Sequence, residues 1–210
     1  SRLGDIPTGM LYHEQALKSL KSDPTSSNEK YYITYNALGG MMWYTSKFDS
    51  AIVYFQKAEK MLALLESSPI NTYYRPAILN NNMAAIYSIQ GKLNESLEAM
   101  QKTVNYLSIF LKEDISDTKR TNAREFLFQA IDNYAGLYKQ MGDYNKAKQL
   151  INYAYLQKLQ FLGAESPEVS KSKILLGQIN VPLKNFDEAE RLLDDGIRGF
   201  KSFEGDYSYW

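Results

Sequence analysis

The residues that could carry acid–base or metal chemistry are few in this chain and lie far apart. The only histidine is His13. The densest carboxylate group, with its nearby arginines, is Asp187, Glu188, Glu190, Arg191, Asp194, Asp195 and Arg198. Opposite charges three or four residues apart pair on the solvated face of a helix. Catalysis needs several tuned groups in one place, so we expect no enzyme, no metal site and no cofactor.

The composition limits the classes of partner. The chain has 210 residues, of which 44% are hydrophobic, enough for a folded domain. Its 24 basic residues balance its 24 acidic ones, which argues against nucleic acid and anionic membranes. It has no cysteine and no apolar run of the ~20 residues that span a bilayer. We therefore expect a soluble chain, with the compartment open and a slight preference for the cytoplasm.

The stretch from Asp132 to Gly163 has the pattern of two helices joined by a turn at Met141-Gly142-Asp143. Apolar residues recur at three- and four-residue steps on both sides of the turn, at Tyr134, Leu137, Tyr138 and Met141 and then at Tyr144, Ala147, Leu150, Ile151, Ala154 and Leu156. Each helix therefore has one apolar stripe. Gly142 suits the left-handed conformation that ends a helix.

A common spacing of small and large residues repeats four times along the chain. Offsets of 0, 12, 16 and 19 residues give the sets Gly39, Ala51, Phe55, Ala58; Ala84, Ser96, Met100, Thr103; Ala135, Ala147, Ile151, Ala154; and Gly177, Ala189, Leu193, Gly196. Two helices approach to about 8–9 Å only where their facing side chains are small. The pattern predicts four helical hairpins, each with a first and a second helix.

These sets resemble the tetratricopeptide repeat (TPR) family, whose unit is a helix–turn–helix of about 34 residues. Here the successive steps are 45 residues from Ala51 to Ser96, 51 from Ser96 to Ala147 and 42 from Ala147 to Ala189, so the helices are longer. The linker 162–169, Leu-Gly-Ala-Glu-Ser-Pro-Glu-Val, resembles that of kinesin light chains and bacterial multi-repeat proteins. The resemblance implies an all-α, right-handed superhelical array of antiparallel hairpins, an α-solenoid, with the first helices on its concave side.

The predicted organisation has three parts. Residues 1–27 form a partial repeat or capping helix, residues 28–204 form four hairpins, and residues 205–210 begin a further repeat of a longer protein. We expect Pro182 to end the fourth unit's first helix early and to remodel its turn. The second helix of that unit would then present an uncovered apolar face, through which the chain could self-associate.

The resemblance also indicates where a ligand would bind. An asparagine two places before the small residue, present here as Asn82 and Asn133, can pair its amide with the backbone of an extended peptide. The alternative is that both only stabilise neighbouring helices or contact water. The remaining candidate side chains on the concave face are Asn36, Tyr44, Lys139 and Lys171.

The function expected from this family is interaction with a protein or an extended peptide. The basic clamp of chaperone-binding members is absent, because its lysine and arginine positions hold Asn36, Gln129 and Asn133. Two readings remain open. The chain is a scaffold that holds a partner segment in its groove, or it is a sensory domain whose ligand controls a downstream effector domain. A third class, an enzyme or a carbohydrate-binding surface receptor, has no supporting set of residues.

Overall fold

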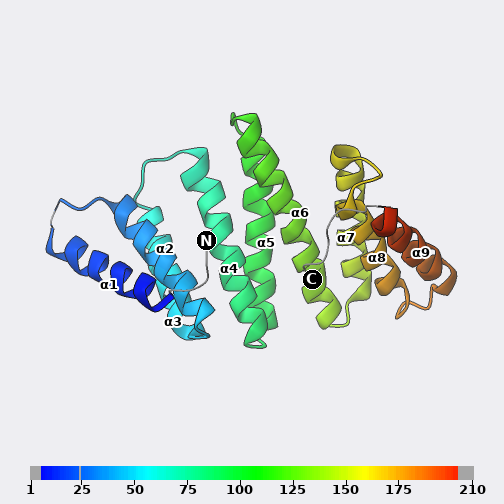
Figure 1. Cartoon of the computed structure of the whole chain (residues 1–210), viewed down its shortest axis with the longest axis horizontal. Helices are drawn as coiled ribbons and strands as arrows, with labels where there is room; N and C mark the ends of the chain where they lie inside the picture. The colour runs from blue at the N-terminus through cyan, green and yellow to red at the C-terminus, as the bar shows by residue number, and fades with distance from the viewer. Residues whose placement is uncertain (1–5, 24, 203–210) are drawn as a thin grey trace. The chain divides into compact units, whose positions relative to one another are not determined.

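The computed structural model of this chain describes residues 6–23 and 25–202, and within those ranges every regular element is helical. The α-helices and one π-helical turn, η2, follow the chain in order (Figure 1): α1 Ile6–Ser22, α2 Asn28–Tyr44, α3 Phe48–Leu62, η2 Ile70–Tyr74, α4 Arg75–Ile89, α5 Leu93–Phe110, α6 Asp117–Gln140, α7 Tyr144–Leu162, α8 Pro167–Asn180 and α9 Phe186–Ser202. The prediction of an all-α chain of helical hairpins is confirmed for these residues. The boundary expected at residue 205 lies outside them.

Side-chain caps fix three of the helix starts in the described residues. At the start of α7 the Asp143 side chain accepts a hydrogen bond from the Lys146 amide. The Ser27 side chain accepts a hydrogen bond from the Lys30 amide at the start of α2, and Ser166 caps α8 just before Pro167. Serine at this position satisfies an amide that has no partner within the helix, and proline at the first helical position loses no bond. The polar linkers before these helices are therefore helix-start signals as well as breaks.

The four turns inside the hairpins share one backbone conformation. Each contains one residue with positive φ: Ser46 at 57°, Gly91 at 72°, Gly142 at 79° and Lys184 at 61°. In all four, the next amide donates to the carbonyl five residues earlier, at 2.8–3.0 Å, from Lys47 to Met42, Lys92 to Tyr87, Asp143 to Tyr138 and Asn185 to Asn180. This is the Schellman ending of a helix. Serine and lysine thus adopt here the conformation that usually favours glycine.

Pro182 shortens α8 without changing this turn. Helix α8 ends at Asn180, four residues before Lys184, whereas α2 ends at Tyr44, two residues before Ser46. The predicted early ending is confirmed, since proline disfavours helix at the residue before it. The predicted remodelling of the turn is wrong, because Lys184 keeps the left-handed conformation and its hydrogen bond.

Exchanging the turn residues should change stability in opposite directions. Ser46→Gly is expected to raise the free energy of unfolding by about 0.5–1 kcal/mol, because a left-handed side chain costs about 1–2 kcal/mol and glycine flexibility offsets part of the gain. Gly91→Ala should lower the same quantity by about 1 kcal/mol, although a Cβ there meets nothing within 4 Å. Urea denaturation measures both, and changes of the same sign would contradict the explanation.

The chain divides into two compact units, Ser1–Arg124 and Glu125–Trp210. In the first unit, α2 packs on α3, α3 on α4 and α4 on α5, while α1 packs on α2. Phe55 is fully buried beside Gly39, where an added Cβ would lie 2.6 Å from the Phe55 ring. Ser96 Oγ donates to the Ala84 carbonyl at 2.7 Å. The predicted close approach of small residues therefore occurs in both hairpins of this unit.

In the second unit, α8 packs on both α7 and α9. Ala135 of α6 and Ala147 of α7 are buried in one cluster with Ile151, so the predicted facing of these helices is confirmed. A Cβ on Gly177 would lie 2.6 Å from Leu193 Cγ and 3.0 Å from the Ala189 carbonyl oxygen. The spacing of the fourth set thus also brings two backbones together.

Candidate functional site

Successive first helices carry a polar residue three positions before the small residue, namely Asn36, Asn81 and Asp132. In two of them one acceptor oxygen, Asn36 Oδ1 and Asp132 Oδ1, is buried and has no hydrogen-bond partner among the described residues. The only other such side-chain atom in these ranges is Gln90 Oε1. An unpaired buried acceptor costs about 1–3 kcal/mol. Two at one repeat position therefore lack a partner within the described residues, and a water or a ligand donor would supply it.

Asp132 is held by a buried network inside the second unit. Its Oδ2 lies 2.8 Å from Lys158 Nζ of α7, and Lys158 is 0% exposed. Lys158 Nζ also donates to Ser172 Oγ of α8 at 3.1 Å and lies 3.7 Å from Glu168 Oε2. The network pairs Oδ2 and leaves Oδ1 as the unpaired acceptor of this carboxylate.

The electrostatics of Asp132 agree with an under-solvated carboxylate. Burial raises the pKa of Asp132 above its usual value, and the nearby Lys158 ammonium, which lowers it, does not fully compensate. Removing an ionised oxygen from water is unfavourable unless it gains hydrogen bonds. A donor reaching Oδ1 would supply the missing stabilisation of the charged form.

The structure places the predicted asparagines on first helices with their amides free. Asn82 of α4 is half-buried and Asn133 of α6 is exposed, and neither side chain makes a hydrogen bond to another described residue. Asn82 lies in the first unit and Asn133 in the second, so each unit contributes one amide to its own first-helix face. Their role in binding stays a prediction.

The other predicted side chains are also accessible. Tyr44 is 70% exposed and stacks on Trp43, with ring centroids 6.3 Å apart. Lys139 of α6 is exposed, and Lys171 of α8 lies 4.0 Å from Glu168. Trp43 is partly buried against the core of the first unit. Tyr44 thus offers an aromatic surface supported from behind by Trp43.

A cavity of about 390 Å³ opens in the first unit beside the Asn82 helix. Its lining comes from α2, η2, α4, α5 and the start of α6: Tyr32, Ile70, Tyr74, Arg75, Ile78, Phe110, Lys119 and Asn122. The Arg75 guanidinium stacks over the Tyr32 ring at 4.7 Å and forms a bidentate ion pair with Glu29, at 2.6 and 2.9 Å. Ile78 is four residues before Asn82, about 6 Å along the helix. The cavity therefore continues the face that carries the free amide.

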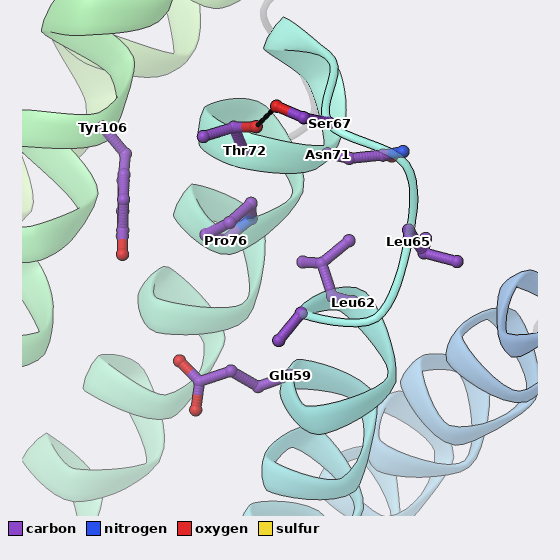
Figure 2. Close-up of a pocket in the computed structure, with 9 residues that line it drawn as sticks. Glu59, Leu62, Leu65, Ser67, Asn71, Thr72, Pro76 and Tyr106 are labelled. Atoms are coloured by element: carbon purple, nitrogen blue, oxygen red, sulfur yellow. Dashed lines mark hydrogen bonds between the residues drawn. The ribbon is translucent and has the colours of Figure 1, made fainter.

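A second cavity in this unit, of about 360 Å³, lies between α3, η2 and α5 (Figure 2). Polar groups around it already bond within the chain, since Ser67 and Thr72 hydroxyls lie 3.3 Å apart and Asn71 Nδ2 donates to the Glu66 carbonyl. Asn71 Oδ1 accepts from Arg75. This cavity therefore offers fewer unpaired groups to a ligand than the first-helix face does.

Metal clusters and membrane-spanning helices are both absent from the part of the chain that the structure describes. No cluster of three or more histidine, aspartate or glutamate side chains suited to a metal was found in the described ranges. In the same ranges, no helix combines the length and apolarity needed to cross a membrane. On α9, Phe186 is 62% and Ile197 44% exposed. Self-association through this helix stays a prediction.

Sequence reasoning missed Lys158 and its network. Lys158 follows Ala147 by 11 residues, and the same offset from Ala51 and Ser96 leads to Leu62 and Leu107, both buried. A lysine at a position that is leucine in two sister repeats was a detectable signal. Lysine is almost never fully buried unless it is paired, so the register alone could have predicted a buried partner.

Comparison with known proteins establishes the fold. No family model matches the sequence, and no curated protein does. BtubC (BKLC) from P. vanneervenii is similar in structure with a TM-score of 0.76 and 17% identity, over 96% of this chain and 76% of that one. A kinesin light chain-like protein of nearly identical TPR-like repeats from Podosopora anserina gives 0.75 and 16%, over 96% and 90%.

A third similar structure is the Rap conjugation gene regulator of the plasmid pLS20 in complex with the Phr* peptide. Its TM-score is 0.57 at 13% identity, over 92% of this chain and 48% of that one. At these identities the likeness concerns the fold. The chain has a TPR-type helical repeat fold, and the resemblance inferred from its small-residue spacing is confirmed.

Proposed function

We propose that the chain is a scaffold that holds an extended segment of a partner protein along the faces of its first helices. The observation that carries this proposal is the pair of buried, unpaired acceptors, Asn36 Oδ1 and Asp132 Oδ1, at one repeat position. A packed core would leave such atoms unpaired only at a cost. A peptide backbone, which presents an N–H at every residue except proline, supplies the missing donor.

Free amides on the first helices fit the same ligand. Asn133 directly follows Asp132 in the second unit, whereas in the first unit Asn82 is on α4 and the unpaired acceptor Asn36 is on α2. A carboxamide donates through its nitrogen and accepts through its oxygen, and can therefore pair with one backbone C=O and one N–H. Such contacts grip an extended chain whatever its sequence. This supports a peptide over a small ligand of fixed shape.

Selectivity would come from the side chains around the amides. The first unit offers apolar groups, with Ile33 50% and Ile89 58% exposed, and the cavity at Ile78 accepts a large apolar or aromatic side chain. The second unit offers Lys139, an exposed cation without an ion-pair partner among the described residues. We infer that the first unit favours an apolar side chain of the ligand and that the second unit favours an acidic one.

A solved structure of the same fold supports a peptide ligand. The pLS20 Rap regulator is in complex with the Phr* peptide, so a protein with a similar helical array binds a peptide. The proposal for this chain rests on its own acceptors and amides. It requires that these residues contact the ligand.

The Asn82→Ala, Asn133→Ala double variant should lose the partner while staying folded. Each lost amide is expected to cost about 1–3 kcal/mol of binding free energy, since the ligand groups it served are left unpaired. The test immobilises the full chain, captures partners from its native source, and compares the affinity of the purified partner for both proteins. Circular dichroism confirms the helical fold of the variant.

The matched control is Asn94→Ala with Asn145→Ala. These asparagines are exposed on the second helices α5 and α7, and their side chains make no hydrogen bond to another described residue. The control should bind like the unmodified chain. Undiminished binding by the folded Asn82, Asn133 variant would place the interaction elsewhere, on the second helices or on an end of the array.

A further inference from the structure

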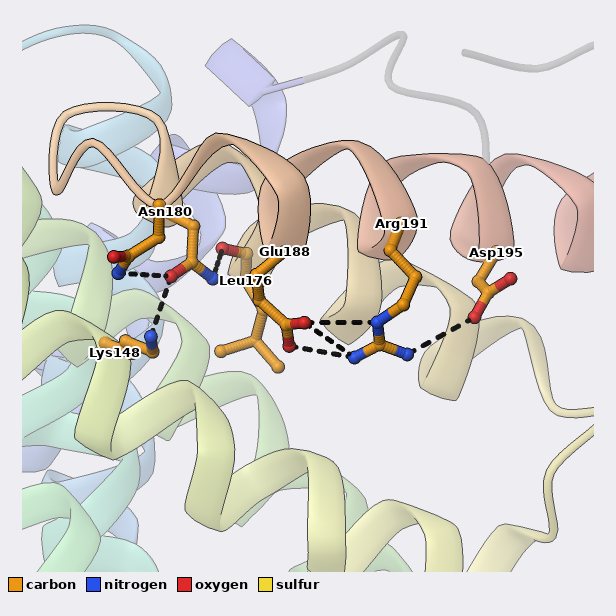
Figure 3. Close-up of polar contacts among 7 residues, drawn as sticks. Lys148, Leu176, Asn180, Glu188, Arg191 and Asp195 are labelled. Atoms are coloured by element: carbon orange, nitrogen blue, oxygen red, sulfur yellow. Dashed lines mark hydrogen bonds and ion pairs between the residues drawn. The ribbon is translucent and has the colours of Figure 1, made fainter.

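A polar cavity of about 220 Å³ lies among α7, α8 and α9 of the second unit (Figure 3). Eight of its ten lining residues are polar or ionisable; the lining is Lys148, Asn152, Tyr155, Lys173, Leu176, Asn180, Glu188, Arg191, Leu192 and Asp195. Such a lining is unusual for a gap between packed helices, which apolar side chains normally fill. The cavity therefore calls for a polar occupant.

The carboxylates of this cavity are already paired with arginines. The Glu188 carboxylate accepts hydrogen bonds from Arg191 Nε at 3.1 Å and from Arg191 Nη2 at 2.8 Å (Figure 3). Asp195 Oδ2 lies 3.8 Å from Arg191 Nη1. Asp195 also accepts from Arg198 Nη2 at 2.8 Å. Two negative charges thus face two positive ones along α9. Neither carboxylate is left to neutralise another cation.

Two lysines in the same cavity have no carboxylate partner among the described residues. Lys148 Nζ donates only to the neutral Asn180 Oδ1, at 2.7 Å, and the Lys173 side chain makes no polar contact with another described residue. Both side chains belong to half-buried residues. Two cations that line one cavity, without a carboxylate partner, favour an anion there.

The position of Lys148 is set by a rigid support. Asn180 is fully buried, and its Nδ2 donates to the Leu176 carbonyl at 2.9 Å. Its Oδ1 accepts from both Lys148 and Asn185 Nδ2, the latter at 3.1 Å. Figure 3 shows Lys148 reaching from α7 to this amide near the end of α8. The ammonium is therefore preorganised at the wall of the cavity.

We propose that this cavity binds a phosphate dianion, either as a phosphomonoester on a partner's side chain or on a small molecule. The two unpaired lysines match the charge of about −1.5 to −2 that a phosphomonoester carries at neutral pH. The Asn152 amide and the Tyr155 hydroxyl, which also line the cavity, supply further donors. The volume admits the phosphate group with a short stem.

This site is separate from the proposed peptide faces. Its cations come from α7 and α8 and its floor from α9, whereas the peptide faces depend on Asn82, Asn133 and the unpaired acceptors of the first helices. A failure of either proposal therefore leaves the other standing.

Titration of the ¹⁵N-labelled full chain with inorganic phosphate should give saturable shifts of the Lys148, Lys173 and Asn180 amides. Potassium chloride at the same ionic strength serves as the screening control. Lys148→Gln and Lys173→Gln should each weaken phosphate binding about tenfold or more, because each removes a charge-assisted bond. Lys146→Gln, at an exposed lysine on α7 that pairs with Asp143, should leave binding unchanged.

Two further probes separate the sources of phosphate. Tighter binding of the blocked tripeptide Gly-phosphoserine-Gly than of inorganic phosphate indicates a modified protein partner, and tighter binding of glucose 6-phosphate indicates a small molecule. Either result supports the site. Shifts that do not saturate, or that persist unchanged in both Lys148→Gln and Lys173→Gln, would overturn it.

Discussion

Lys158→Leu lowers the free energy of unfolding by an expected 3–5 kcal/mol, about the cost of breaking a buried ion pair by removing one partner. Leucine occupies the equivalent position in two sister repeats, at Leu62 and Leu107, so size and hydrophobicity alone predict a harmless change. The loss arises because Asp132 stays buried, with Oδ1 already unpaired and Oδ2 now without its ammonium partner. Urea denaturation followed by circular dichroism measures it.

The matched control adds Asp132→Asn to Lys158→Leu. This double variant reproduces the polar residue found at Asn36 and Asn81, and removes both charges together. It should recover most of the lost stability, because a buried pair replaced by uncharged residues is often neutral. Asp132→Asn alone completes the cycle. Simple addition of the two single costs in the double variant would show that the pair is not coupled.

Gly39→Ala and Gly40→Ala, neighbours in α2, should change stability in opposite directions. A Cβ on Gly39 would lie 2.6 and 2.7 Å from the fully buried Phe55 ring, and overpacking of this kind costs about 1–3 kcal/mol. A Cβ on Gly40 meets nothing within 4 Å. Alanine there should gain about 0.5–1 kcal/mol from helix propensity.

Comparing the two variants removes the shared effects of a glycine-to-alanine change in one helix. The unfolding midpoint in urea, at an unchanged dependence on denaturant, reports the difference directly. Gly39→Ala with the stability of the unmodified chain would mean that α2 and α3 separate at little cost, and that the small-residue spacing does not hold this hairpin together.

The fold was predictable because its main determinant is visible in the sequence. Where two backbones must approach, as at Gly39 against Phe55, only small residues fit, and they recur at a fixed spacing. Glycine indicated the turns at Gly91 and Gly142. At Ser46 and Lys184 the repeat spacing indicated a turn, but the residue types did not indicate the left-handed backbone conformation that the hydrogen bonds hold there.

The site was predictable only in outline. The resemblance indicated Asn82 and Asn133, but residue types could not show that one oxygen of Asn36 or of Asp132 would be buried and unpaired, since this depends on where neighbouring side chains end. The π-helical turn η2 at Ile70–Tyr74 was also missed. It carries no composition signal, yet it supplies two residues to the cavity beside Asn82.

The buried Lys158 gives the third hairpin an identity within the array. Set against a first helix with asparagine at the Asp132 position, as α2 and α4 have, its ammonium would meet a neutral amide in place of a carboxylate. An unpaired buried charge of this kind costs several kcal/mol, so α7 fits badly beside any first helix other than α6. The helices are alike in shape but not interchangeable, and exchange of a single helix between repeats would have to carry both charges together.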